Sequence, residues 1–110
     1  MNTIAHTPEP PYYAVIFTSL RTTHDKGYDA MAEKIYQLAT LQPGYLGFES
    51  ARTDIGISIS YWKDPESILN WKKNSEHLVA QQLGIEVWYA SYKIRICKVE
   101  RDYGRVNATC

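Results

Sequence analysis

The segment GISISYWKDPESILNWKKNSEHLVAQ (Gly56–Gln81) decides the fold, because it passes directly from a strand pattern to a helix pattern. In its first part, residues 56–62, apolar and polar side chains alternate as they do in a half-buried strand. Asp64 and Pro65 follow, and these residue types favour the N-cap and the first position of a helix. We predict that this helix ends shortly before Gly84, because glycine commonly follows the C-terminus of a helix.

The remaining elements follow from the same kind of pattern on either side of this segment. The predicted elements are strands 12–20, 45–52, 56–62 and 87–103 and helices 28–41 and 65–82. Their order, β-α-β-β-α-β, is that of the ferredoxin-like α+β fold, in which two helices cover one face of a four-stranded antiparallel sheet. Gly47 inside the second strand predicts a β-bulge or a close approach of another backbone, and the unusual length of the last strand indicates a further bulge or bend.

The first predicted strand, YYAVIFTSL (Tyr12–Leu20), carries apolar side chains on both of its faces, and 13% of the whole chain is aromatic. A strand that is apolar on both faces is buried on both. Because the helices cover only one face of the sheet, the other would expose a large apolar patch in a monomer. We therefore expect a symmetric homodimer in which the two sheets pack face to face, which gives a dimeric α+β barrel.

Composition limits the class of protein. A chain of 110 residues predicts one domain, residues 12–104, with a flexible N-terminal tail (1–11) and a C-terminal tail (105–110). Twelve basic and twelve acidic side chains give a formal net charge of zero, which argues against nucleic acid as the main partner. The sequence shows neither a secretory signal pattern nor an apolar run of ~20 residues, so we expect a cytoplasmic protein that does not enter a membrane. Cys97 is expected to be a buried thiol and Cys110 a thiol of the tail.

A row of polar side chains follows one side of the predicted second helix. Asn74, His77 and Gln81 recur there at helical spacing, beside an arc that contains Trp71. If the row borders a pocket, His77 and Asn74 are the catalytic candidates. His77 would act as a general base near neutral pH, and Asn74 and Gln81 would bind substrate oxygens. The alternative is that His77 belongs to a polar network on the helix surface or lies at the rim of the dimer.

Three aromatic residues are candidates for binding an aromatic substrate: Trp71, Tyr61 and Trp88. The alternative is that such large side chains anchor the core or an interface, which is their more common role. Glu49 and Arg52 lie near the predicted hairpin, where we expect a structural ion pair.

No cofactor motif is present in the sequence. It contains no phosphate-binding loop, no dinucleotide fingerprint and no Cys-x-x-Cys pair. A metal site would have to combine His24, His77 and scattered carboxylates, which is a weak set of donors. We therefore expect neither a cofactor nor a metal.

Four stretches together resemble one family: GYDAMAEKI, QPGYLGFESAR, ISISYWKDPESILNWKKNSEHLVAQQLG and WYASYKIRICKVERDYG, within residues 13–104. They are similar to the antibiotic biosynthesis monooxygenase (ABM) superfamily, and most to a subgroup of small, uncharacterised bacterial proteins. The resemblance implies a dimeric barrel with a pocket between each sheet and its own helices. Members of the superfamily differ in activity: some oxygenate aromatic substrates without metal or flavin, others degrade haem or act on quinols, and some have no known activity.

The resemblance also separates these activities. Haem-degrading members use an asparagine on the first strand and a histidine about ten residues beyond a tryptophan. Here the first strand lacks asparagine, and the tenth residue after Trp71 is Gln81 rather than histidine. Haem binding is therefore disfavoured. The leading hypothesis is a cofactor-independent monooxygenase that acts on a small aromatic or quinone-like compound. A non-enzymatic dimer that binds a small ligand or serves a stress response is the alternative.

Overall fold

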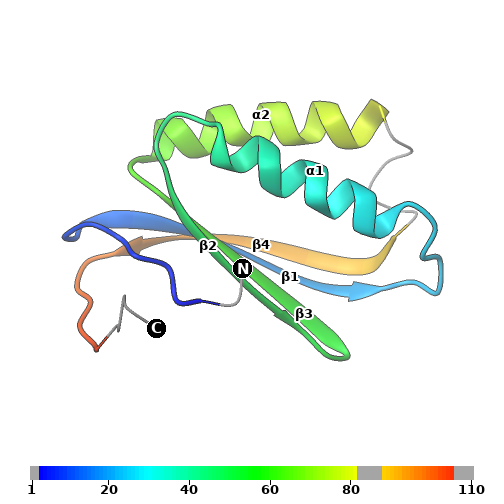
Figure 1. Ribbon diagram of the computed structural model, residues 1–110, viewed down its shortest axis with the longest axis horizontal. Helices are drawn as coiled ribbons and strands as arrows, with labels where there is room; N and C mark the ends of the chain where they lie inside the picture. The colour runs from blue at the N-terminus through cyan, green and yellow to red at the C-terminus, as the bar shows by residue number, and fades with distance from the viewer. Residues whose placement is uncertain (1–2, 82–87, 106–110) are drawn as a thin grey trace.

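The computed structural model describes residues 3–81 and 88–105, without the side chains of residues 78–81 (Figure 1). The predicted order β-α-β-β-α-β is confirmed. In chain order the elements are β1 (Tyr12–Arg21), α1 (Tyr28–Thr40), β2 (Tyr45–Arg52), β3 (Ile55–Trp62), α2 (Pro65–Gln81) and β4 (Tyr89–Val99). The predicted end of the second helix at Gln82, and Gly84 that was predicted to follow it, lie outside the described residues.

The four strands form one antiparallel sheet in the order β2-β3-β1-β4, and both helices lie on the same side of it (Figure 1). Tyr13 and Val15 of β1 pack against a core cluster that includes Ala39 of α1 and Ile68 of α2. Because side chains alternate along a strand, the odd-numbered residues of β1 face the helices and the even-numbered ones face away. We call these two sides the helix-facing side and the open side.

The core is centred on Trp62, which is fully buried. Its ring is stacked on Trp71 of α2, with ring centroids 5.8 Å apart, and meets Tyr45 edge-on at 5.7 Å. The indole N–H of Trp62 donates to Ser60 Oγ at 2.8 Å, so its polar atom is satisfied inside the core. The tryptophan at the end of β3 thus joins the second helix to the sheet.

The start of α2 confirms the predicted cap. Asp64 Oδ1 accepts hydrogen bonds from the backbone N–H of Ser67 at 2.8 Å and from its hydroxyl at 2.7 Å. These bonds lower the pKa of Asp64, because they favour its ionised form. The turn before β2 packs against this cap, and a Cβ at Gly44 (φ +87°) would clash with Ser67.

Two irregularities in the sheet match the predictions. The register between β2 and β3 shifts between Tyr45 and Gly47, which confirms the bulge at Gly47. The pairing of β1 with β4 shifts between Leu20 and Arg21, which confirms an irregularity in the last strand. The predicted span of that strand, 87–103, is too long at its C-terminal end. After Val99 the chain leaves the sheet, and the Asp102 carboxylate accepts a hydrogen bond from Tyr12.

The N-terminal segment, predicted to be a tail, lies against the open side of the sheet (Figure 1). The Ala5 N–H donates to Glu49 Oε2 at 2.9 Å, and the Thr7 hydroxyl donates to the Tyr12 oxygen at 2.9 Å. The tail proposed for residues 105–110 lies almost wholly outside the described residues.

Two smaller predictions are wrong. Glu49 and Arg52 do not form the predicted ion pair, because they are three residues apart on a strand and project to opposite sides. Glu49 accepts from Tyr61 and Ala5, whereas Arg52 donates to Ser19 on the helix-facing side. Cys97 is exposed rather than buried, because its strand, β4, lies at an edge of the sheet and its side chain is on the open side.

Candidate functional site

Trp71 and the polar row of the second helix have different surroundings. Trp71 points toward the sheet and stacks on Trp62, whereas Asn74 and His77 are exposed. The Asn74 amide donates to Gln42 Oε1 at 2.9 Å and so links α2 to the end of α1. The side chain of Gln81, the third member of the row, lies outside the described residues.

The aromatic residues proposed to bind substrate are also separated. Tyr61 lies on the open side, where its hydroxyl donates to Glu49 Oε1 at 2.6 Å. Burial and this hydrogen bond raise the pKa of Tyr61. Trp88 is buried next to the start of α1, and its indole N–H donates to the Lys26 carbonyl at 3.1 Å. The sheet therefore lies between Tyr61 and Trp71.

The structure instead brings together a row of aromatic rings on the helix-facing side. The members of this aromatic row are Tyr92, Phe17, Tyr89, Tyr28 and Trp88. Phe17 of β1 is stacked on Tyr92 at 5.6 Å and meets Tyr89 edge-on at 5.2 Å. Tyr28, the first residue of α1, lies 5.9 Å from Tyr89 and 6.3 Å from Trp88 between ring centroids. The row runs from β4 across β1 to the start of the first helix.

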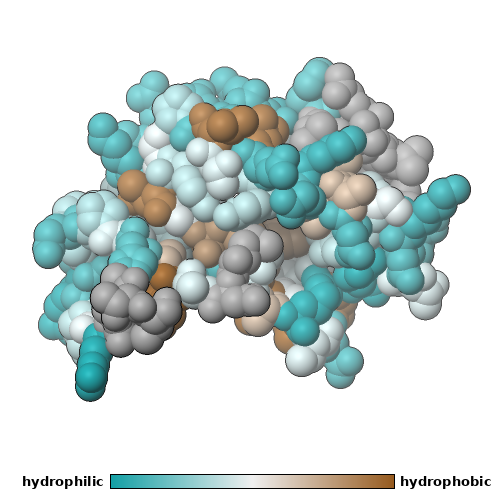
Figure 2. Space-filling model, viewed as in Figure 1, coloured by the Kyte–Doolittle hydropathy of each residue, from teal (hydrophilic) through white to brown (hydrophobic). Residues whose placement is uncertain are grey.

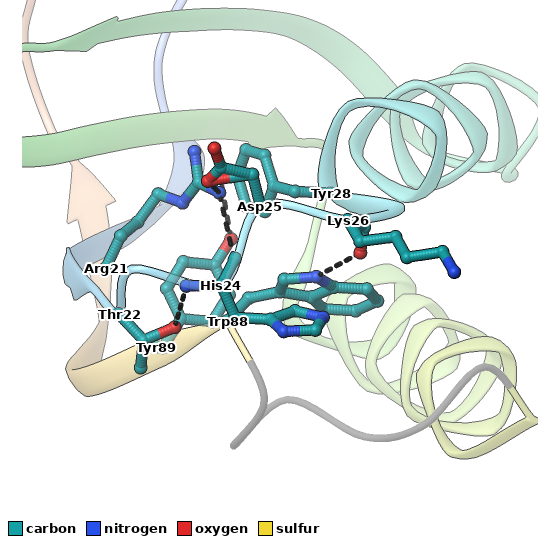
Figure 3. Close-up of polar contacts among 8 residues, drawn as sticks. All are labelled: Arg21, Thr22, His24, Asp25, Lys26, Tyr28, Trp88 and Tyr89. Atoms are coloured by element: carbon teal, nitrogen blue, oxygen red, sulfur yellow. Dashed lines mark hydrogen bonds and ion pairs between the residues drawn. The ribbon is translucent and has the colours of Figure 1, made fainter.

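Two phenol groups and a guanidinium group meet in the middle of this row (Figure 3). The Tyr89 hydroxyl donates to the Tyr28 oxygen at 3.2 Å, and the Cζ atom of Arg21 lies 3.5 Å from the centroid of the Tyr28 ring. Burial is the largest cause that raises the pKa of Tyr89, so this phenol stays neutral and can donate a hydrogen bond at ordinary pH.

The guanidinium of Arg21 is held in place and has one N–H group that makes no hydrogen bond to a described side chain or backbone atom. Its guanidinium is held over Tyr28 and lies 3.7 Å from the exposed carboxylate of Asp25. Among the side chains that the structure describes, the Arg21 Nε atom is buried without a hydrogen-bond partner. Buried donors are nearly always satisfied by protein, water or a ligand, so this N–H is available to a bound acceptor.

One end of the aromatic row continues into exposed apolar surface on β4. Tyr92, Ile94 and Ile96 share the helix-facing side because they pair with Ser19, Phe17 and Val15, and they are 47%, 49% and 59% exposed. Figure 2 shows hydrophilic side chains over most of one face of the molecule, with a prominent apolar group over the helices and smaller ones scattered below it. The exposed surface on β4 suits the flat face of an aromatic molecule.

The other end of the row borders a hollow of about 440 Å³ at the start of α1. Its lining consists of His24, Lys26, Gly27, Ala30, Met31, Lys34 and Trp88. Within residues 3–81 and 88–105, no three His, Cys, Asp or Glu side chains gather in a way that would hold a metal ion. None of the helices in that part of the chain is long and apolar enough to cross a membrane.

Sequence reasoning named Trp88 as a candidate for binding substrate and left Tyr89 open between an anchor and a stacking surface, but it missed Arg21 and Tyr28. Tyr28 and Tyr89 are 61 residues apart, and their contact depends on β4 pairing with β1. The available signal was the clustering of aromatic residues at the ends of elements that the ferredoxin-like order places at the same end of the sheet. That signal indicates proximity but not which hydroxyls meet.

Comparison with known proteins agrees with this architecture. No family model matches the sequence. The uncharacterised protein YqjZ of Bacillus subtilis is 47% identical over 104 residues, which cover 93% of this chain and 91% of YqjZ. A jasmonate monooxygenase, ABM, of Pyricularia oryzae is 22% identical over 94 residues, 84% of this chain but only 39% of the fungal protein.

Among solved structures, SnoaB of Streptomyces nogalater, a cofactor-independent oxygenase, superposes with a TM-score of 0.71 at 7% identity. The match covers 87% of this chain and all of SnoaB. At that identity the likeness to SnoaB shows the fold alone, whereas the near full-length match to YqjZ shows that this chain and YqjZ belong to one family. The chain belongs to the antibiotic biosynthesis monooxygenase domain superfamily.

Proposed function

We propose that the protein is a cofactor-independent monooxygenase of a small aromatic or quinone-like compound, which binds along the aromatic row. The observation that carries this proposal is the meeting of the Tyr28 and Tyr89 hydroxyls with Arg21 beside exposed apolar surface. The rings supply stacking surface, and the Tyr28 hydroxyl and the guanidinium supply hydrogen-bond donors for a substrate oxygen, while Tyr89 donates to Tyr28. The fold shared with SnoaB and the similarity to a fungal monooxygenase support the reaction class.

The proposed reaction starts with loss of a proton from a phenol or hydroquinone, which gives an electron-rich anion. A guanidinium close to the substrate stabilises this negative charge, and it does so more strongly in a partly buried site than in water. The anion then reacts with O₂ at a ring carbon. A carbon that carries two hydrogens in the keto tautomer becomes a carbonyl, and the second oxygen atom leaves as water. The substrate supplies all the electrons, so no flavin or metal is required.

The proposed reaction also requires a base that accepts the proton of the substrate. Tyr89 is unsuited to this role because its raised pKa keeps it protonated. His24 lines the hollow next to the aromatic row, whereas His77 is exposed on α2. Comparing the pH profiles of His24→Gln and His77→Gln variants distinguishes them, because loss of the base removes the acidic limb of the profile. We expect that effect from His24→Gln and a nearly unchanged profile from His77→Gln.

Oxygen uptake tests the function. We expect at least one member of a panel of phenols, hydroquinones and polycyclic phenols to give enzyme-dependent uptake in the absence of added metal or flavin. Replacing Tyr28 by Phe removes only the hydroxyl, whose oxygen accepts from Tyr89 and whose own proton is left for a substrate oxygen. We expect kcat/KM to fall by about tenfold, the effect of one lost hydrogen bond to a charged group.

Tyr61→Phe is the matched control, because it removes a phenol that is also bonded but lies on the open side of the sheet. Equal losses in the two variants would contradict the proposed site. Absence of uptake with every compound, together with tight binding of some of them, would instead favour a non-enzymatic ligand-binding protein.

We further propose that the open side forms a homodimer interface. On this side Leu20, Ile55 and Ile57 are 46%, 48% and 41% exposed, and they lie on adjacent strands. Lys93 and Arg95 lie on the same side at the β4 edge, and Glu49 lies at the β2 edge. A second copy would cover the isoleucines, and a twofold axis can bring edges of opposite charge together.

A further inference from the structure

The hollow at the start of α1 has a basic rim. His24, Lys26 and Lys34 line it, and its described lining contains no carboxylate. Among the residues that the structure describes, neither lysine forms an ion pair, and the nearby Asp25 pairs with Arg21. Glu33, on the same helix, accepts a hydrogen bond from Gln37 at 3.0 Å. The positive charge at the rim is therefore available to a ligand.

Part of the lining of the hollow is apolar. Ala30, Met31 and Trp88 contribute to it; Ala30 is exposed, whereas Met31 and Trp88 are only 5% and 3% exposed and are therefore fixed by packing. The Trp88 ring is further held by its N–H bond to the Lys26 carbonyl at 3.1 Å (Figure 3). A volume of about 440 Å³ lies in the range of sites that take small molecules and has room for a molecule of one or two rings.

The hollow and the aromatic row share Trp88, which lies 6.3 Å from Tyr28. We infer that the hollow binds the carboxylate end of an aromatic acid, with the ring against Trp88 and the carboxylate between Lys26 and Lys34. The substrate class of the proposed oxygenase is then small aromatic acids rather than neutral polycyclic compounds. That the bound acid is a substrate rests on the proposed function, but binding of the acid at this site can be tested without turnover.

The test compares salicylate with salicylamide, two molecules of the same shape that differ in charge. We expect calorimetry at low salt to give an affinity for salicylate at least about tenfold higher than for the amide, as two partly exposed ion pairs would supply. The double variant Lys26→Met/Lys34→Met should lose about that factor for salicylate and none for salicylamide. Methionine keeps much of the apolar length of lysine, so the change is confined mainly to charge.

Lys72→Met/Lys73→Met is the matched control, because it removes the same net charge from exposed positions on α2. It should leave salicylate affinity unchanged. A local readout is the indole N–H resonance of Trp88, identified by its absence in Trp88→Phe, which should shift on addition of salicylate. Equal affinity for the two compounds, equal effects of the two double variants, or an unmoved Trp88 resonance would each overturn the inference.

The two assays distinguish failure of the proposed oxygenase from failure of the aromatic-acid site. Lysine-dependent binding of salicylate without oxygen uptake from any phenol would keep the anion site and reject the oxygenase. Uptake from neutral phenols that is insensitive to Lys26→Met/Lys34→Met would keep the oxygenase and reject the substrate class.

Discussion

At the scale of the residue, the environment of each side chain decides its role more than its chemical type. Tyr61 and Tyr89 are both phenols with a raised pKa, but Tyr61 bonds to a carboxylate on the open side and Tyr89 faces Tyr28 and Arg21. The sequence predicted that tryptophans act as anchors or stacking surfaces, and the structure assigns Trp62 to the core. It could not separate these roles, because a side chain's neighbours across the sheet depend on register.

Trp62 provides the first prediction at this scale. Trp62→Ala should lower the free energy of unfolding by about 3–5 kcal/mol, because it removes a fully buried ring and leaves a cavity. Urea denaturation followed by circular dichroism measures this loss. Leu69→Ala is the control, since Leu69 is 58% exposed on the neighbouring helix. A loss for Trp62→Ala no larger than that for Leu69→Ala would show that the core is placed wrongly.

At the scale of the element, local signals predicted the helix starts and the bounds of β1, β2 and β3 to within one residue, but they missed the C-terminal end of β4. Asp64 and Pro65 specify the beginning of α2 through a bond within the same turn. The end of β4 is set by partners far away in the sequence, such as the bond between Tyr12 and Asp102, which are 90 residues apart. The polar row on α2 was interpreted as the edge of a pocket from helical spacing alone. Helical spacing shows which residues share a face of the helix, but it does not show what lies opposite that face.

The cap at Asp64 gives a pH prediction for this element. The folded-state pKa of Asp64 lies below that of an unfolded aspartate, which is about 4. Its contribution to stability is therefore present above ~pH 4 and is lost as the pH falls through the folded-state value. Asp64→Ala should be destabilised relative to the wild type at neutral pH, and the difference should shrink on acidification. Urea midpoints measured at several pH values give this difference.

Glu66→Ala is the matched control, because it removes a carboxylate from the first turn of the same helix. It should be less destabilised than Asp64→Ala at neutral pH, since the Ser67 bonds to Asp64 remain. A difference between Asp64→Ala and the wild type that grows as the pH falls would contradict the cap's assigned role.

At the scale of the whole molecule, the order of elements was enough to predict the ferredoxin-like fold, because few topologies satisfy β-α-β-β-α-β with short connections. Of the candidate site only Trp88 was predicted, because the site is assembled from the end of β1, the start of α1 and the start of β4. Arg21, Tyr28 and Tyr89 meet only once the strands are paired. The two sides of the sheet then have separate roles in our proposals: the helix-facing side binds the ligand and the open side binds a second copy.

The proposed assembly is testable at this scale. Ile57→Lys places a charge on the open side and should reduce the mass measured by light scattering at micromolar concentration from that of a dimer to about 12.7 kDa. Ile94→Lys introduces the same group at a similarly exposed position on the helix-facing side, and the dimer should persist. A wild-type mass already near 12.7 kDa would exclude the dimer.

In our proposals an aromatic ligand binds on the helix-facing side, along the aromatic row. The decisive measurement is titration with 1-hydroxy-2-naphthoate, which carries both a phenol and a carboxylate, followed through ring resonances of isotope-labelled tyrosines. We expect shifts at Tyr28, Tyr89 and Tyr92 and none at Tyr12 and Tyr61, which lie on the open side. Shifts at Tyr12 and Tyr61 with unmoved Tyr28 and Tyr89 would contradict this placement of the ligand.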